Sequence, residues 1–155
     1  MNTQLLVNMN VELATSEDAL NHISEFLIEN AYVKPSYDMA IREREAMYPT
    51  GIDLGFGAVA IPHCDAAHAI KPCVYLIRPV KPIVFERADD DGEVKAAIIM
   101  ALVVTNPAEQ MKLLRSLFSS LQDEVFFNDL KNSTTIESMI EIFNSKILYI
   151  AEEII

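Results

Sequence analysis

The chain has 155 residues, 51% of them hydrophobic and 23% charged, which is the composition of an ordinary folded protein. This length predicts a single domain over residues 1–155, with its core at about 10–148. The net charge of −11, from 23 acidic and 12 basic residues without a basic cluster, argues against binding to nucleic acid or to an anionic membrane.

The first part of the chain predicts a strand followed by a helix. Residues 4–13 partly alternate between apolar and polar side chains, as in a strand. Thr15 or Ser16 then provides an N-cap, and acidic residues follow in the first turn. Because apolar residues recur at helical spacing after this cap, we expect the helix to run to about residue 30.

A second helix and a short strand are expected next. Ser36 can cap a helix over residues 37–47, which would carry Arg44. Residues 58–61 form a short apolar run, and Pro62 ends its ladder pairing because proline has no N–H to donate. His63 is therefore expected where a loop leaves the end of a strand.

The rest of the chain predicts more strands and then helices. Strands are expected at 73–78, 83–87 and 94–104, the last of them so apolar that both faces should be covered. Asn106 caps the next helix, with Pro107 in its first turn. The residues expected to form the core face of this helix are Met111, Leu114, Leu117, Phe118 and Leu121.

Two further helices are expected near residues 123–131 and 134–148. Helices thus precede and follow a set of strands. This order predicts an α/β fold in which a mixed sheet of four to five strands is flanked by helices.

The sequence also indicates where the protein resides. No Lys or Arg precedes Lys34, so we do not expect a signal peptide. The longest apolar run, residues 96–104, is much shorter than the roughly 20 residues of a membrane-spanning helix. We therefore expect a cytoplasmic protein without membrane insertion, in which Cys64 and Cys73 are thiols.

His63 and Arg44 are the candidate catalytic residues. Small residues after His63 leave room for a partner, and a neutral imidazole can act as a nucleophile near pH 7. Phosphoryl transfer needs mainly positioning and stabilisation of charge, which a guanidinium supplies bidentately. The alternatives are an ordinary polar loop residue for His63 and, for Arg44, an exposed residue paired with Glu45 or another acid.

A metal site is the competing interpretation of this region. The possible ligands are His63, Cys64, Asp65, His68 and Cys73. Their spacing matches neither a Cys-x-x-Cys motif nor two histidines one helical turn apart. A metal-dependent hydrolase or metal sensor remains an alternative, but no metal is expected.

Two motifs together resemble those of a known family. The pattern RExxxPTG over residues 44–51, followed by AIPH over 60–63, is similar to the fructose/mannitol-type EIIA component of the bacterial sugar phosphotransferase system. The likeness continues through residues 106–117 and so covers nearly the whole chain. The segments 61–69, 75–79 and 88–91 resemble most the galactitol-specific branch.

This resemblance implies both a fold and a reaction. The fold would be a mixed sheet between helices, and the protein would be a phosphotransferase component without metal or organic cofactor. A phosphoryl group would pass from HPr to Nε2 of His63, the match to the active-site histidine. It would then pass to a cysteine of the cognate EIIB and finally to a sugar, such as galactitol or a related polyol. The active-site arginine of the family matches Arg44.

One position departs from the family pattern. Many members carry a second active-site histidine on the helix after the last strand, where this chain has Gln110. Glutamine can donate a hydrogen bond to a phosphoryl oxygen but cannot become a cation. Gln110, Thr50 and His68 are therefore supporting candidates, with His68 as the alternative to the missing ring. A regulatory EIIA-like domain, in which phosphorylation of His63 is a signal, is the alternative function.

Overall fold

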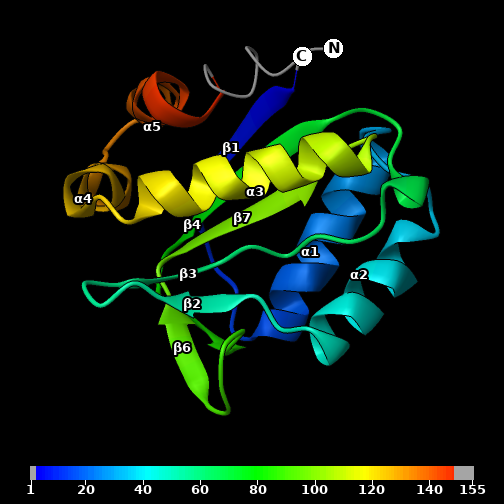
Figure 1. The fold of residues 1–155 in the computed structure, drawn as a ribbon, viewed down its shortest axis with the longest axis horizontal. Helices are drawn as coiled ribbons and strands as arrows, with labels where there is room; N and C mark the ends of the chain where they lie inside the picture. Colours follow the sequence, from blue (N-terminus) through cyan, green and yellow to red (C-terminus); the bar gives the residue numbers. More distant parts are fainter. Residues whose placement is uncertain (1–2, 149–155) are drawn as a thin grey trace.

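A five-stranded mixed sheet lies between two layers of helices in the computed structural model, which describes residues 3–148 (Figure 1). The strands are β1 (Gln4–Val11), β2 (Gly51–Asp53), β3 (Ala58–Ala60), β4 (Cys73–Pro79), β5 (Ile83–Glu86), β6 (Glu93–Ala96) and β7 (Ile98–Val103). The helices are α1 (Ser16–Glu29), α2 (Tyr37–Met47), α3 (Pro107–Leu121), α4 (Glu124–Asn132) and α5 (Ile136–Phe143), with a short 3-10 turn, η1 (Ala66–His68), and a π-helical turn, η2 (Asn144–Leu148). The predicted α/β class with a mixed sheet is confirmed.

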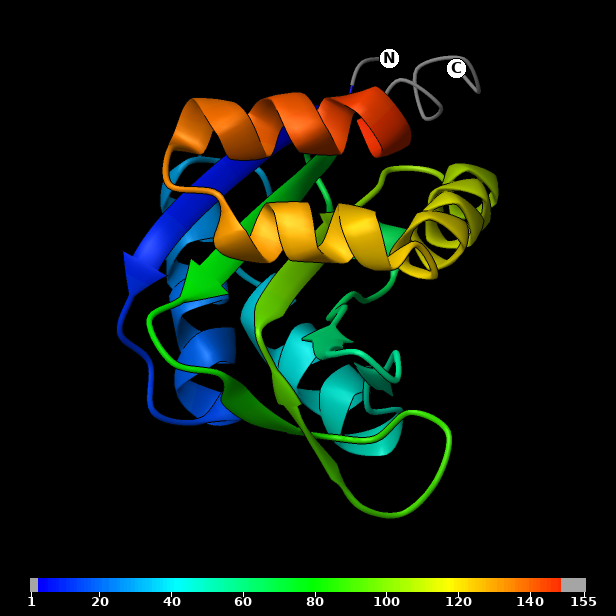
Figure 2. The same ribbon diagram turned by 90° about the vertical axis from the view of Figure 1, so that its left-hand side faces the viewer.

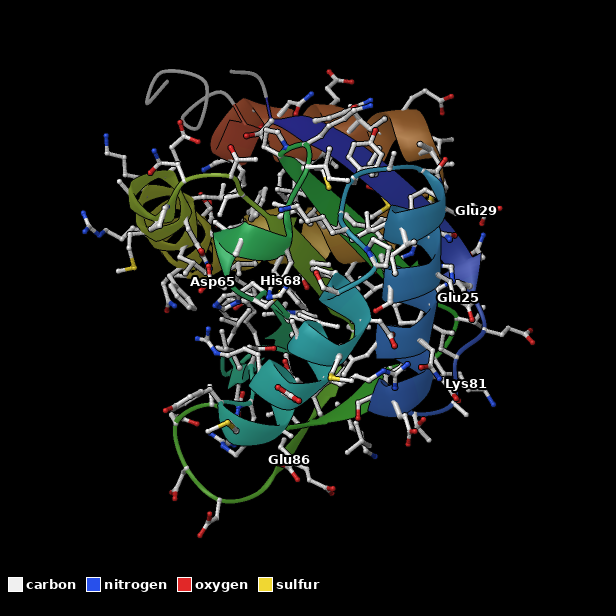
Figure 3. All side chains as sticks on the ribbon, turned by 90° about the vertical axis from the view of Figure 1, so that its right-hand side faces the viewer. Glu25, Glu29, Asp65, His68, Lys81 and Glu86 are labelled. Carbon is white, nitrogen blue, oxygen red and sulfur yellow. The ribbon has the colours of Figure 1, made fainter. Side chains whose placement is uncertain are left out.

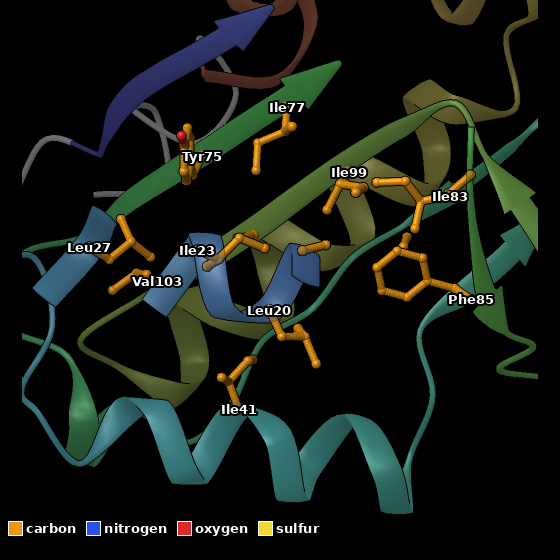
Figure 4. Close-up of a cluster of buried hydrophobic side chains, with 14 of the residues drawn as sticks. Leu20, Ile23, Leu27, Ile41, Tyr75, Ile77, Ile83, Phe85, Ile99 and Val103 are labelled. Carbon is orange, nitrogen blue, oxygen red and sulfur yellow. The ribbon is translucent and has the colours of Figure 1, made fainter. Parts of the chain in front are cut away.

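The central strands are buried on both faces, which confirms this part of the prediction for residues 98–103 but not for residues 94–96, where exposed and buried residues alternate. In β4, Tyr75 and Ile77 face a core formed with α1 and α2, which Figure 4 shows in close-up. Val74 and Leu76 alternate with them and face a second core against α3, α4 and α5. Figure 2 shows α4 and α5 lying side by side on this face. Within residues 3–148, no helix has both the length and the apolar character needed to cross a bilayer.

The sheet topology places His63 at one end of the central strands. The strand order is β1-β4-β7-β3-β2, with β3 parallel to β7 and β2 antiparallel to β3. Beyond β3 the chain continues along β7, because the Leu102 N–H donates to the Pro62 carbonyl oxygen at 3.1 Å. His63 then forms a parallel bridge with Leu102. It therefore leaves the sheet at a defined position beside β7.

Most of the predicted helix caps are confirmed. Thr15 accepts a hydrogen bond from the Asp18 N–H at 3.1 Å, and Asn106 accepts one from the Ala108 N–H at 2.8 Å. Ser36 stands at the N-cap position of α2, as predicted, but its side chain forms no capping hydrogen bond. Its hydroxyl lies 2.8 Å from Nδ1 of His68 instead, because η1 packs against the start of α2.

The predicted single strand over 94–104 is wrong. Its first part is β6, which pairs with β5 in a separate two-stranded hairpin, and its second part is β7 in the main sheet. Between them the Ala97 N–H donates to the Ala58 carbonyl oxygen at 2.9 Å. A continuous apolar run indicates burial but carries no information about which strand each half pairs with.

The predicted core face of α3 needs a similar correction. Leu117 and Leu121 are fully buried, but Met111 is 53% exposed and Phe118 is 41% exposed. The buried side of α3 also includes Leu113, which was not expected in the core. Compared with the prediction, the face that packs on the sheet is therefore shifted around the helix toward Leu113. Because Met111 and Phe118 are seven residues apart, they form one row along the flank of the helix, away from the sheet.

Candidate functional site

His63 carries its proton on Nδ1. This atom lies 2.7 Å from the carbonyl oxygen of Ile61, which has no proton to donate, so Nδ1–H must be the donor. In the neutral ring the other nitrogen, Nε2, then bears the lone pair. The side chain is half-buried at the end of β3, so the backbone fixes both the tautomer and the ring orientation.

The surroundings of His63 favour its neutral form. Burial lowers the pKa of His63, and the positive charge of Arg44 lowers it further, while the hydrogen bond to Ile61 acts in the opposite direction. A neutral imidazole with a free Nε2 is the nucleophilic form. The electrostatics and the hydrogen bond therefore select the same reactive state near pH 7.

Arg44 lies on α2 close to His63 and has no acidic partner. Its Nε atom is buried without a hydrogen-bond acceptor, and none of the ion pairs between described residues includes this side chain. The guanidinium carbon lies 5.2 Å from the centre of the Tyr48 ring, a cation–π contact. Pairing with Glu45, the alternative considered from the sequence, does not occur. The positive charge of Arg44 is therefore available to an anion.

The Pro-Thr-Gly turn after α2 connects this helix to the histidine segment. The backbone N–H and the hydroxyl of Thr50 donate to the two carboxylate oxygens of Glu45, each at 2.8 Å. The Ile61 N–H lies 3.2 Å from Thr50 Oγ1 and 3.3 Å from the Thr50 carbonyl oxygen. Thr50 is thus placed beside the site, as the sequence suggested, whereas Glu45 was considered only as a partner of Arg44.

The glycine of the same turn is required by a close approach. A Cβ atom at Gly51 would lie 2.5 Å from the carbonyl oxygen of Glu86, a distance that side-chain carbons do not tolerate. The Ala88 N–H also donates to the Gly51 carbonyl oxygen at 2.9 Å. The turn is therefore clamped against the β5–β6 hairpin, which limits where Thr50 can lie.

The other two supporting candidates occupy different positions. Gln110 is half-buried in the first turns of α3, and its side-chain amide forms no hydrogen bond with another described residue. His68 is the last residue of η1 and Asp65 caps the start of this turn (Figure 3); Nδ1 of His68 lies 2.8 Å from the hydroxyl of Ser36. His68 is therefore already engaged at the start of α2, whereas the Gln110 amide has no such partner.

The possible metal ligands do not gather. Among the described residues, no group of three or more His, Cys, Asp or Glu side chains is arranged to hold a metal ion. Cys64 and Cys73 are free thiols, as predicted, and both are buried. Burial raises the pKa of Cys64 to about 11 and that of Cys73 to about 12, so both remain protonated near pH 7.

The arrangement of His63 and Arg44 suits transfer of a phosphoryl group. A nitrogen with a free lone pair lies near enough to Arg44 to feel its charge, and no ion pair between described residues includes that guanidinium. Such a transfer asks for in-line positioning and for stabilisation of charge on the phosphoryl oxygens. The nucleophile is already unprotonated at Nε2, so no general base is needed.

Comparisons with known proteins agree with this chemistry. A model of the family described as "Phosphoenolpyruvate-dependent sugar phosphotransferase system, EIIA 2" matches residues 1–146. The chain is 41% identical over 120 residues to the PTS system galactitol-specific EIIA component of Escherichia coli K12, covering 77% of this chain and 80% of the relative. It is 26% identical over 132 residues to the mannitol-specific EIICBA component of the same strain, covering 83% of this chain but 20% of that longer protein.

Solved structures share the fold. The complex of enzyme IIAMTL and phosphorylated enzyme IIBMTL from Escherichia coli matches with a TM-score of 0.72 and 24% identity, over 90% of this chain and 94% of that chain. The nitrogen regulatory protein IIA-Ntr from Neisseria meningitidis matches with a TM-score of 0.69 and 20% identity, over 89% of this chain and 90% of that one. At these identities the likeness shows the architecture alone.

Proposed function

The chain belongs to the EIIA 2 family of the phosphoenolpyruvate-dependent sugar phosphotransferase system, and from this premise we propose that His63 accepts the phosphoryl group and Arg44 stabilises it. The protein is a phosphoryl carrier of such a system. The observation that carries the proposal is the hydrogen bond from Nδ1 of His63 to Ile61, which leaves Nε2 free, within the electrostatic reach of an Arg44 side chain that forms no ion pair with a described acid.

The first step takes the phosphoryl group from HPr, the proposed donor. The bond between phosphorus and the donor's histidine nitrogen breaks as Nε2 of His63 forms its bond to phosphorus. No proton moves, because Nδ1 keeps its proton; the ring becomes positively charged, and the Ile61 carbonyl stabilises that charge. Arg44 stabilises the negative charge on the phosphoryl oxygens during transfer.

The second step passes the group to a cysteine of an EIIB component. A cysteine thiolate attacks phosphorus, a P–S bond forms, and the P–N bond to His63 breaks. The electron pair returns to Nε2, so His63 recovers its neutral Nδ1–H form without a proton transfer. The similar IIAMTL structure, a complex with phosphorylated enzyme IIBMTL, supports EIIB as the kind of partner.

The sugar of the system is proposed to be galactitol or a related polyol. The relative at 41% identity is named galactitol-specific, whereas the mannitol-specific relative shares 26%. The likeness to IIA-Ntr is one of fold, so it does not favour a regulatory role over transport.

Phosphoryl labelling tests the acceptor residue. The purified protein is incubated with labelled phosphoenolpyruvate and the general phosphotransferase proteins, enzyme I and HPr. We expect one acid-labile phosphoryl group per chain, which is lost in His63→Gln and kept in His68→Gln. His68 is a suitable control because it is the neighbouring histidine and is bonded to Ser36. Labelling of His63→Gln at the wild-type rate would contradict the proposal.

A second experiment tests the partner. The labelled protein is mixed with purified EIIB of the galactitol type or of the mannitol type, and loss of label is followed. Faster transfer to the galactitol type is expected. Equal rates would contradict the proposed specificity, and transfer to neither would point to the regulatory alternative.

A further inference from the structure

Glu45 is a buried carboxylate with no catalytic role assigned to it so far. The residue is 9% exposed, and its two carboxylate oxygens accept the two hydrogen bonds from Thr50. Burial raises the pKa of Glu45, while the bonds from Thr50 and the charge of Arg44 act in the opposite direction. A buried charge is costly unless it is hydrogen-bonded, so the carboxylate and Thr50 hold each other in place.

Three hydrogen-bonded links lead from this carboxylate to the nucleophile. Glu45 holds Thr50, both oxygens of Thr50 lie within reach of the Ile61 N–H, and the Ile61 carbonyl accepts from Nδ1 of His63. The last two links both use Ile61: its N–H donates to Thr50, and its carbonyl oxygen accepts from His63. A shift of Thr50 would therefore move the carbonyl that fixes the imidazole.

The same contacts keep Glu45 away from the nearby cations. Arg42 lines the same cleft as Glu45, of about 440 Å³ between α1, α2 and β5, but it pairs with Asp38 at 3.1 Å. Arg44 precedes Glu45 in the chain and forms no ion pair with a described acid. Thr50 holds the carboxylate by both oxygens. Glu45 therefore attracts Arg44 through space without forming an ion pair with it, and the guanidinium keeps its own hydrogen-bond donors for another anion.

We propose that Glu45 is a positioning residue for phosphoryl transfer, which acts through Thr50 to present Nε2 of His63 beside a free Arg44. This inference rests on the proposed role of His63 as phosphoryl acceptor. It assigns to Glu45 an effect on the ring, not contact with the phosphoryl group.

Substitutions at both ends of the contact test the inference. Glu45→Met removes both acceptors at similar length, and we expect labelling of His63 to slow about tenfold, since a misplacement of ~1 Å can cost ~10²-fold. Glu45→Gln should lose less, because its amide oxygen still accepts one bond from Thr50. Glu43→Met is the matched control, because Glu43 is an exposed acid on the same helix.

Thr50 provides an independent pair of variants. Thr50→Val removes the hydroxyl at nearly constant volume and should slow labelling as Glu45→Met does. Thr50→Ser keeps the hydroxyl and should be labelled at close to the wild-type rate. Nitrogen NMR of His63 is measured in every variant. We expect the Nε2–H tautomer to appear in Glu45→Met and Thr50→Val, a change that a loss of stability alone would not produce.

The outcomes separate this inference from the carrier function. If the wild type is not labelled, or His63→Gln is labelled like the wild type, the proposed function fails. If the wild type is labelled on His63 while folded Glu45→Met and Thr50→Val keep the wild-type rate and tautomer, only the role of Glu45 fails. Should both variants unfold, the His63 tautomer in Glu45→Gln decides: a pure Nδ1–H form with an unchanged rate would overturn the inference.

Discussion

The carbonyl oxygen of Ile61 lies 2.7 Å from Nδ1 of His63, and this contact determines which ring nitrogen can react. A carbonyl only accepts hydrogen bonds, so the proton must stay on Nδ1. Ile61 is itself held by a hydrogen bond to Thr50. The preference of His63 for the Nδ1–H tautomer is therefore set by the surrounding backbone and not by the imidazole alone.

His63 should titrate below the ordinary histidine value of about 6.5, because burial and the charge of Arg44 lower its pKa. Nitrogen NMR from pH 8 to 5 should show one neutral Nδ1–H tautomer that gains a second proton only below that value. Phosphoryl acceptance should stay level down to pH 6.5 and fall at lower pH, as Nε2 becomes protonated. A ring half-protonated at pH 7 would contradict this expectation.

Arg44→Met should slow phosphoryl transfer by about 10²- to 10³-fold, because it removes a preorganised charge from the transition state. Arg44→Lys should lose less, since an ammonium keeps the charge but not the planar fork. The same Met variant should raise the pKa of His63, which NMR titration detects. Arg42→Met is the control, because Arg42 is paired with Asp38 on the same helix and should change neither value.

Tyr48 should contribute through its ring and not its hydroxyl. The ring holds the Arg44 guanidinium by a cation–π contact, worth about 0.5–1 kcal/mol at an exposed position. Tyr48→Leu should therefore slow transfer by roughly two- to fivefold, whereas Tyr48→Phe should transfer at the wild-type rate. Stopped labelling reactions measure both, and an equal loss in the two variants would show that the hydroxyl matters instead.

His22, which lies on α1, should make the free energy of unfolding depend on pH. Its Nε2 lies 2.7 Å from the Tyr75 hydroxyl and 3.4 Å from the amide nitrogen of Asn8. An amide nitrogen can only donate, so Nε2 of the neutral ring is the acceptor. Burial lowers the pKa of His22, although the charge of Glu25 opposes this. The folded pKa lies below the unfolded one, so this contribution is complete above about pH 6.5 and is lost as the pH falls.

Chemical denaturation at pH 7, 6 and 5 measures that effect. The free energy of unfolding should fall less steeply with decreasing pH in His22→Gln than in the wild type. The difference in slope cannot exceed about 1.4 kcal/mol per pH unit for a single proton. Identical slopes in the two proteins would show that His22 keeps its ordinary pKa in the folded state.

Some local elements of the site followed directly from the sequence. Thr15 and Asn106 cap their helices as predicted. These caps depend on neighbours within a few residues along the chain. The predicted end of strand pairing at Pro62 is wrong, because the Leu102 N–H donates to the Pro62 carbonyl oxygen and His63 bridges to Leu102 on β7. The three-residue strand β2 was not predicted, because Gly51 joins the sheet through its pairing with Ala60 and has no strand pattern of its own.

The errors share one cause. Residues 94–104 are as apolar as predicted, but their two halves pair with different strands. On α3, Met111 and Leu117 both belong to a wide apolar stripe, and only docking onto the sheet selects which side is buried. Periodicity identifies apolar residues, whereas the identity of the partner depends on how distant elements pack.

The sequence by itself determined the reactive groups: a histidine after a short strand, an arginine on the preceding helix, and the family motifs that contain them. Only the tertiary structure decided that Glu45 bonds Thr50 and leaves Arg44 unpaired, and that Ile61 orients the ring. The physical reason is that residue type sets what a side chain can do. Its hydrogen-bond partner and its pKa depend on contacts made across separate elements after the chain has folded.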